Sequence, residues 1–371
     1  MNTPSPSTSG TAPIRVGLIG CGNVSRRYLD NIAGSTALTI VACADLVPAA
    51  AQLLQVERGI PAVDVDTLLA SDDIDLVLNL TVPESHAELS MRALRAGKHV
   101  YTEKPLAAEV DDARALLAVA DELGMLVGCA PDTVLGAGLT TCAALIADGA
   151  IGVPVSATAL MMTPGPERFH PGPEMLFRHG AGPLFDGGPY DVSALVGLLG
   201  PVTRVGAVAT TARVTRQILV GDRVGLSFPV ETPTHVSSVL QFARGAVASL
   251  VTSFDVIETT APRLEVHGTE GSLVAPAPNS WGGPVRIRRT GESEFSDVPV
   301  DTVHPGFMGM GLIDMAEAIV EGREPRASGA RGLHVLEVLT GIRASVEDGR
   351  FCDIAPVDAD AVISPLGRTQ Q

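Results

Sequence analysis

The chain has 371 residues, 46% of them hydrophobic, and carries a formal net charge of −16 at pH 7. This length and apolar content are sufficient for two domains with large cores. So acidic a chain repels nucleic acid and anionic membranes, and we expect neither as a partner.

The N-terminus and the cysteines bear on where the protein works. Residues 1–13 are rich in Ser, Thr and Pro and lack the basic start and apolar core of a signal peptide, so we expect a disordered tail. No apolar run reaches the roughly 20 residues that span a bilayer. The five cysteines are dispersed, without a C-x-x-C pair or a cysteine and histidine cluster. This pattern is typical of reduced thiols, and we predict a cytoplasmic protein without a metal site.

Apolar strands alternate with helical segments between residues 14 and 130. The predicted strands are residues 14–20, 37–45, 74–81, 99–103 and 125–130. The predicted helices are residues 24–33, 48–58, 66–73, 84–96 and 109–124, the fourth ending at a left-handed Gly97. Strands that are apolar throughout and alternate with helices indicate a parallel sheet covered on both faces. Because crossovers are right-handed, residues 14–130 are predicted to form a doubly wound Rossmann domain.

The pattern changes after residue 130. Helices are predicted at residues 137–148, 189–199, 308–321 and 329–347, and a loop rich in Pro and Gly at 163–183. Strands are predicted at residues 153–162, 234–242, 246–254, 263–268 and 271–276. The last four alternate polar and apolar residues, which favours an antiparallel sheet with one exposed face. Residues 131–371 are therefore predicted to form an α+β domain with a large, mainly antiparallel open sheet.

A glycine-rich turn joins the first predicted strand to the first helix. Gly20-Cys21-Gly22-Asn23-Val24-Ser25 fits G-x-G-x-x-[G/A], except that Ser25 replaces the last small residue. Gly20 permits a tight turn, and Gly22 lets a pyrophosphate approach the backbone at a helix N-terminus. Asp45 ends the second strand, where a carboxylate can accept both ribose hydroxyls of adenosine and repel a 2′-phosphate. We predict that this turn binds NAD in preference to NADP.

The fourth strand leads into Glu103-Lys104-Pro105. The simplest interpretation of such a pair is a solvated turn. On a strand, however, neighbouring side chains point to opposite faces, so Glu103 and Lys104 are expected to diverge. Lys104 is then expected to point into the cleft, where burial and a cationic nicotinamide would lower its pKa towards a range useful for proton transfer.

Residues 80–107, LTVPESHAELSMRALRAGKHVYTEKPLA, strongly resemble the signature of the glucose–fructose oxidoreductase, inositol dehydrogenase and rhizopine catabolism (Gfo/Idh/MocA) family. That signature is T-x-P-x-x-H followed by A-L-x-A-G-K-H-V-x-x-E-K-P. The matching residues are Thr81, Pro83, His86, Ala93, Leu94, Ala96, Gly97, Lys98, His99, Val100, Glu103, Lys104 and Pro105. Residues 182–200, GPLFDGGPYDVSALVGLLG, are similar to the family's G-x-L-x-D-x-G-x-H-x-x-D, and residues 266–273 to a later turn, so the resemblance covers nearly the whole chain.

The resemblance implies an NAD(P)-dependent dehydrogenase acting on a secondary alcohol of a sugar, glycoside or cyclitol. It implies that the second domain binds the substrate and forms a homodimer or homotetramer. Lys104 falls on the family's catalytic lysine, Glu103 on its neighbour near the nicotinamide, and Asp186 on the first acid of the second motif. Tyr190 stands where most members have a histidine, and Ser193 where they have the final Asp. Further cofactor contacts are implied at Thr81, Val82, Pro83 and His86.

The partners of Lys104 have alternative roles. Tyr190 lies four residues after Asp186, so both share one helical face if the helix has already begun. Tyr190 would relay a proton only if a cation such as Lys104 lowered its pKa from about 10, and it would otherwise shape the pocket. Asp186 would orient a substrate hydroxyl or, alternatively, cap a helix.

Other residues are candidate substrate contacts. Asp132 and Thr133 lie where the second domain begins, close to the expected nicotinamide. Arg168, His170 and Arg178 lie in the 163–183 loop, where they would receive a substrate carboxylate or remain surface charges. His334 is expected to be structural.

The function has two alternatives. One is a catalytically silent sensor of a sugar or nucleotide on the same fold. The other is an enzyme that reduces a C–C or imine bond, or that recycles a tightly bound cofactor between two sugars.

Overall fold

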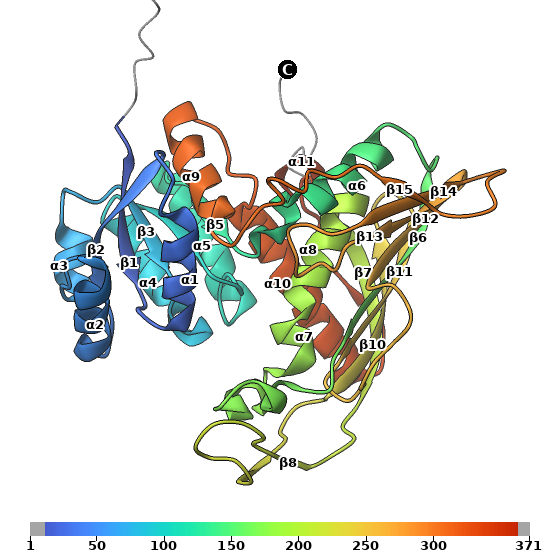
Figure 1. Cartoon of the computed structure of the whole chain (residues 1–371), viewed down its shortest axis with the longest axis horizontal. Coiled ribbons are helices and arrows are strands. Elements are labelled where there is room, and N and C mark those ends of the chain that lie inside the picture. Colours follow the sequence, from blue (N-terminus) through green and yellow to red (C-terminus); the bar gives the residue numbers. More distant parts are fainter. Residues whose placement is uncertain (1–11, 363–371) are drawn as a thin grey trace, which may run out of the picture.

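The N-terminal part of the chain forms a parallel sheet. The computed structural model describes residues 12–362, and residues 1–11 of the expected tail lie outside this range. The strands are β1 (Ile14–Ile19), β2 (Leu38–Ala44), β3 (Leu76–Asn79), β4 (His99–Thr102) and β5 (Val127–Cys129). Their order is β2-β1-β3-β4-β5 and every pair is parallel, as predicted (Figure 1). The strand order reverses between β1 and β3, which is where ligands bind in open α/β sheets.

Helices cover both faces of this sheet, as the uniformly apolar strands predict. They are α1 (Asn23–Ile32), α2 (Pro48–Arg58), α3 (Val65–Ala70), α4 (Pro83–Arg95) and α5 (Val110–Leu123). Apolar side chains of α1 and α2 form one core with the sheet, and those of α3, α4 and α5 form another. After α4 the chain turns at Gly97, whose φ of 72° is the left-handed conformation predicted there.

The second sheet is larger and mixed. Its order is β15-β14-β13-β12-β6-β11-β10-β7-β16, and among these neighbours only β6 and β11 are parallel. The predicted strands are β6 (Pro154–Met162), β10 (His235–Phe242), β11 (Val247–Ser253), β12 (Leu264–Gly268) and β13 (Gly271–Ala275). Helices α6 (Ala137–Ala147), α8 (Gly188–Leu199) and α10 (Gly329–Asp348) share a core with one face. The other face is open, as predicted, and exposes Val208, Val239 and Val247.

Several elements were not predicted. They are β7 (Val202–Thr210), β8 (Thr215–Gln217), β9 (Ser227–Pro229), β14 (Val285–Arg289), β15 (Ser296–Val298), β16 (Cys352–Asp353), α7 (Gly182–Asp186), α11 (Ala359–Val362) and the 3₁₀ turns η1 (Asp132–Leu135), η2 (Pro166–Arg168) and η3 (Pro173–Phe177). Residues 163–181 and 211–233, here called the lower lobe, project below the second sheet (Figure 1). Strands β8 and β9 pair only with each other in this lobe.

The last helices connect the two sheets. Helix α9 (Met310–Glu321) is late in the sequence, yet it lies beside the first sheet (Figure 1). Its Leu312 and Met315 pack in the same core as Tyr28 of α1. Ser328, which precedes α10, forms an antiparallel bridge with Gly128 of β5. These contacts fix the two parts of the chain against each other around the ends of β4 and β5. None of the helices within residues 12–362 is long and apolar enough to cross a membrane.

Candidate active site

The glycine turn has the shape of a phosphate cradle. Gly20 has a φ of +100°, and a Cβ there would lie 2.6 Å from the carbonyl carbon of Leu80. Glycine therefore lets the β1–α1 and β3–α4 turns lie side by side at the switch point. A Cβ on Gly22 would meet nothing within 4 Å, so this side of the turn is open. The residues present fit a dinucleotide pyrophosphate at the N-terminus of α1.

Ser25 fits the position of the third small residue. Its side chain is fully buried, and its Oγ donates a 2.7 Å hydrogen bond to the carbonyl of Gly22. The extra hydroxyl is thus used within the turn. The departure from the glycine pattern leaves the cradle intact.

Asp45 holds the turn from the end of β2. Its Oδ2 accepts a 2.7 Å hydrogen bond from the Cys21 amide, and its Oδ1 accepts one of 2.8 Å from the Val47 amide. Each carboxylate oxygen has a second lone pair for another donor. The carboxylate is therefore oriented before any ligand binds.

The β3–α4 turn supports the cradle from the other side. Thr81 Oγ1 donates to the buried Asn79 side chain at 2.7 Å, Val82 is 51% exposed, and Pro83 starts α4. His86 is 1% exposed, and its ring nitrogens lie 2.6 Å from the Pro105 carbonyl and 3.1 Å from the Thr81 carbonyl. The ring of His86, a predicted cofactor contact, is thus buried and holds the β3–α4 turn against the loop that follows Lys104.

Glu103 and Lys104 point in opposite directions, as expected. Glu103 Oε1 accepts a 2.9 Å hydrogen bond from the hydroxyl of Tyr28 on α1, and its Oε2 accepts the Lys104 amide at 3.0 Å. Lys104 Nζ instead crosses to α7 and donates to the Asp186 carbonyl at 3.0 Å. The Lys104–Pro105 peptide bond is cis. Tyr28 was not predicted, because within α1 nothing distinguishes it from an ordinary core residue.

Asp186 and Tyr190 both meet Lys104. Asp186 is the last residue of α7, and Tyr190 lies in the first turn of α8, with Gly187 between the two helices. The Asp186 Oδ1 lies 3.4 Å from Lys104 Nζ, which is 5.5 Å from the centre of the Tyr190 ring. Among the described residues no side chain caps α8, so the capping alternative for Asp186 does not hold. The structure thus brings together three of the predicted site residues.

The charge balance at Lys104 differs from expectation. Burial alone would lower the pKa of Lys104, but the Asp186 carboxylate, Tyr190 and Glu103 together raise it above its ordinary value. Burial raises the pKa of Tyr190, and the opposing effect of the Lys104 charge is too small to reverse this. The expectation of a lowered lysine pKa omitted the carboxylates that the fold places around it. In the absence of ligand, Lys104 is an ammonium group.

Asp132, a predicted substrate contact, is buried and hydrogen-bonded to distant parts of the chain. It is 3% exposed, and its carboxylate accepts hydrogen bonds from the Gly309 and Gly311 amides at 2.8 and 3.1 Å and from Trp281 Nε1 at 3.0 Å. Burial raises the pKa of Asp132 to about 6 despite these bonds. Asp132 therefore anchors the start of α9. Thr133, 1% exposed, is likewise buried.

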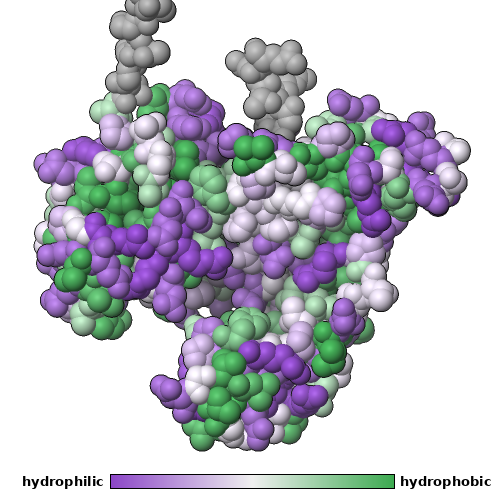
Figure 2. All heavy atoms as spheres, in the orientation of Figure 1, coloured by the Kyte–Doolittle hydropathy of each residue, from purple (hydrophilic) through white to green (hydrophobic). Residues whose placement is uncertain are grey.

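The predicted arginines lie at the surface of the lower lobe. Arg168 and Arg178 are exposed, and His170 Nδ1 accepts the Gly172 amide at 3.0 Å within its own turn. The buried arginine of this lobe is Arg216, which pairs with Glu167 and Asp255 and lies over the Phe177 ring. Figure 2 shows the molecule hollowed between the N-terminal domain and the lower lobe.

His334 is fully buried and accepts the Val202 amide at 3.0 Å, which agrees with the structural role expected for it.

Comparison with known proteins identifies the family. Residues 14–130 match the model of an oxidoreductase family with an NAD-binding Rossmann fold, and residues 139–274 match a Gfo/Idh/MocA C-terminal domain. A dTDP-3,4-didehydro-2,6-dideoxy-alpha-D-glucose 3-reductase from Streptomyces violaceoruber is 30% identical over 79% of this chain and 82% of its own length. The chain belongs to the Gfo/Idh/MocA family of oxidoreductases.

Other Gfo/Idh/MocA proteins align over most of their length. An inositol 2-dehydrogenase from Rhizobium meliloti (strain 1021) is 27% identical over 92% of this chain and 99% of its own. The structure of levoglucosan dehydrogenase in its apo form aligns with a TM-score of 0.81 over 94% of this chain and all of that chain, at 22% identity. This last likeness concerns the fold. The chain is an oxidoreductase with an NAD-binding Rossmann domain, as the resemblance implied.

Proposed function

We propose that the protein is an NAD(P)-dependent dehydrogenase that transfers hydride between the cofactor and a secondary alcohol or ketone of a sugar, glycoside or cyclitol. The observation that carries the proposal is the contact of Lys104, at the end of β4, with Asp186 and Tyr190 of the second domain. This contact lies at the carboxyl edge of the parallel sheet, beside the Gly20–Gly22 cradle. In this proposal residues 14–130 bind the cofactor and residues 131–371 bind the substrate.

Lys104 handles the proton in this proposal. When bound, the nicotinamide ring accepts or donates the hydride. In the reduction direction, the Lys104 ammonium donates a hydrogen bond and then its proton to the substrate oxygen. In the oxidation direction, the neutral amine of Lys104 takes the hydroxyl proton, so it must first lose its own. Asp186 orients the amine, and its charge stabilises the ammonium form.

Tyr190 is the second candidate for the proton. Its ring lies within reach of Lys104, but its raised pKa makes the hydroxyl a poor acid at neutral pH. We therefore assign Tyr190 to the shape of the pocket and to the hydrogen-bonding of the substrate. Replacing Tyr190 by Phe separates the two roles, because a positioning residue leaves the pH dependence of turnover unchanged.

The substrate class follows from the relatives and from the cleft. Relatives that align over nine tenths of their length are named as an inositol dehydrogenase and a 1,5-anhydro-D-fructose reductase. Both substrates are rings with several hydroxyl groups, which suit a site where Lys104 and Asp186 offer one donor and one acceptor. In this proposal Asp45 favours NAD, because a carboxylate at the end of β2 would repel a 2′-phosphate.

Two other proposals concern assembly and turnover. The open face of the large sheet, with its exposed valines, supports a homodimer or homotetramer, which light scattering after gel filtration tests.

The silent-sensor alternative is disfavoured because Lys104 is held in the cleft by Asp186. The alternative in which a tightly bound cofactor is recycled between two sugars differs from the proposed dehydrogenase in one expected observation. In that case the nucleotide remains bound to the protein during purification.

The experiment that tests the function is a substrate screen. Purified protein is mixed with sugars, glycosides and inositols in the presence of NAD or NADP, and absorbance at about 340 nm is followed. We expect turnover with at least one polyhydroxylated ring. If the protein binds no nicotinamide nucleotide by calorimetry, the proposal is wrong. If nucleotide co-purifies and is reduced only once per chain, the sugar–sugar alternative holds.

A further inference from the structure

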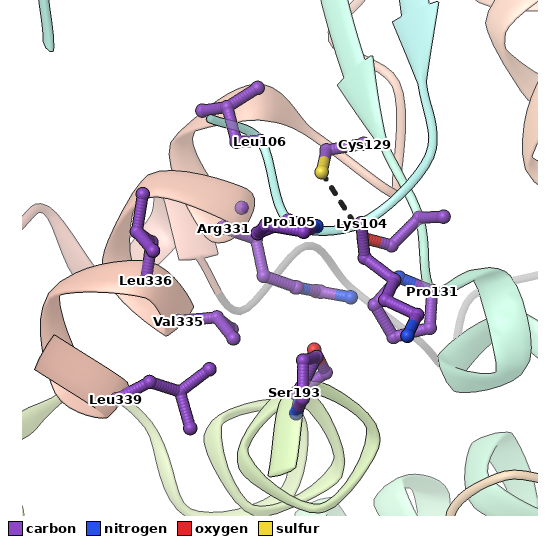
Figure 3. A pocket seen from close by; sticks show the side chains of 13 residues that line it. Lys104, Pro105, Leu106, Cys129, Pro131, Ser193, Arg331, Val335, Leu336 and Leu339 are labelled. Atoms are coloured by element: carbon purple, nitrogen blue, oxygen red, sulfur yellow. Dashed lines mark hydrogen bonds between the residues drawn. The ribbon is translucent and has the colours of Figure 1, made fainter. Parts of the chain in front are cut away.

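A narrow pocket lies beside Lys104, between the end of β4 and helices α8 and α10. Its walls come from both parts of the chain and include Lys104, Pro131, Pro189, Ser193 and Arg331 (Figure 3). Its free space is enough for about one water-sized particle. The pocket is thus too small for a sugar, and neither the cofactor cradle nor the ion pair of Lys104 accounts for its polar groups.

Arg331 enters this pocket from the first turn of α10. The residue is 3% exposed, and its Nε donates a 2.8 Å hydrogen bond to the carbonyl of Val362. Both terminal nitrogens, Nη1 and Nη2, are buried and find no acceptor among the described residues. Figure 3 shows the guanidinium extending between Pro105 and Ser193. Four N–H donors are therefore directed into an enclosed space.

Among the described residues nothing compensates the charge of Arg331. No carboxylate within residues 12–362 lies within ion-pair distance of its guanidinium, whereas the buried Arg216 has two. Burial lowers the pKa of Arg331 to about 10, and the more distant Asp314 only partly opposes this. A buried cation without a counter-charge is costly. One neutral water would accept hydrogen bonds from two of these donors and would leave the charge uncompensated.

A second unpartnered group lines the same pocket. Ser193 on α8 is 1% exposed, and its Oγ has no hydrogen-bond partner among the described residues. This is the position at which the second motif of the family has an acidic residue. Gly332, one residue after Arg331, places the N-terminal end of the 20-residue helix α10 at the pocket wall, where the helix dipole favours negative charge. Hydroxyl, guanidinium and helix terminus converge on one small volume.

We infer that the pocket between Arg331 and Ser193 binds a small monoatomic anion of the chloride class. The anion accepts hydrogen bonds from Nη1 or Nη2 of Arg331 and from Ser193 Oγ, and it neutralises the guanidinium. The size of the pocket excludes a carboxylate-bearing metabolite, and its two unpartnered donor groups exclude a cation. By joining α8 to α10, the anion holds the wall against which Lys104 lies.

Bromide tests this site in the wild-type protein. Crystals grown in sodium bromide are measured at the bromine absorption edge. We expect an anomalous peak between the Arg331 guanidinium and Ser193 Oγ. A water-like peak without anomalous signal overturns the inference.

Chloride binding in solution gives a second readout, independent of crystal concentrations and of turnover. We expect the ³⁵Cl NMR line to broaden with wild-type protein, and the excess broadening to be lost in Arg331→Met. The control Arg178→Met changes an exposed arginine and retains the broadening. Should Arg331→Met fail to fold, Ser193→Asp supplies a fixed carboxylate beside the guanidinium and is expected to displace the anion. Bromide in the crystal without chloride broadening in solution, or broadening that survives Ser193→Asp, overturns the inference. Neither readout uses catalysis, so failure of the proposed function leaves this test unaffected.

Discussion

The Asp186–Lys104 contact predicts a specific change in the pH dependence of alcohol oxidation. In the proposed mechanism oxidation requires the neutral amine of Lys104, and Asp186 is the largest of the charges that raise the pKa of this amine. The two charged atoms lie 3.4 Å apart, with side chains 19% and 37% exposed. At this separation and partial exposure, their Coulomb interaction is about 1–2.5 kcal/mol, which corresponds to about 1–2 pH units. Asp186→Asn keeps the shape of the side chain and removes this interaction.

We expect the rising limb of kcat/KM for oxidation to move to lower pH by about one unit in Asp186→Asn. The assay is the initial rate of NADH formation at about 340 nm between pH 6 and 11, with the substrate found by the screen. Asp112→Asn, which changes an exposed carboxylate on α5, is the matched control and leaves the limb in place. A limb that stays in place in Asp186→Asn, or moves to higher pH, would refute the electrostatic reasoning.

Three further predictions concern the cofactor and stability. Asp45→Ala is expected to lower the ratio of kcat/KM for NAD over NADP by about tenfold or more, measured by steady-state kinetics with both cofactors. Arg216→Met leaves Glu167 and Asp255 without their buried partner and should lower the free energy of unfolding by about 3–5 kcal/mol, followed by Trp281 fluorescence in urea. A loss below 1 kcal/mol would contradict this reasoning. Burial raises the pKa of Asp191 to about 7 in the folded protein, so the folded state gains protons relative to the unfolded chain, and stability should fall as pH rises from about 4 through 7. Asp191→Asn should therefore raise the free energy of unfolding by about 1–3 kcal/mol at pH 8 and change it little at pH 4; equal effects at both pH values would argue against it.

The regular parts of both sheets could be predicted because the local pattern of apolar and polar residues indicates which side chains are buried. Strand β3 is apolar throughout, which indicates a strand buried on both faces. Strand β10 alternates polar and apolar residues, which indicates one buried and one exposed face. Strand β8 could not be predicted in this way, because its buried centre is Arg216, whose partners Glu167 and Asp255 lie 49 and 39 residues away. The return of α9 to the first sheet is likewise a long-range packing event with no local signal.

The site was predictable to a similar extent. Lys104, Asp186 and Tyr190 could be proposed because they stand in recognisable motifs, and the structure places them together. The hydrogen-bond partners of Asp132 could not be predicted, because Gly309 and Gly311 lie 177 and 179 residues away. Arg331 gave no signal, since a charged residue at a helix start is ordinarily solvated and only the fold shows it buried.

The role of Lys104 in proton transfer is tested most directly by Lys104→Met, in which the ammonium is removed and the aliphatic stem is kept. Cofactor binding and turnover are measured on the same preparation, by NADH fluorescence titration and by NADH formation with saturating NAD and substrate. We predict that NADH affinity stays within about threefold of wild type while kcat falls by about 10²–10⁴. Turnover within tenfold of wild type, with cofactor binding intact, would contradict the assignment of the proton to Lys104.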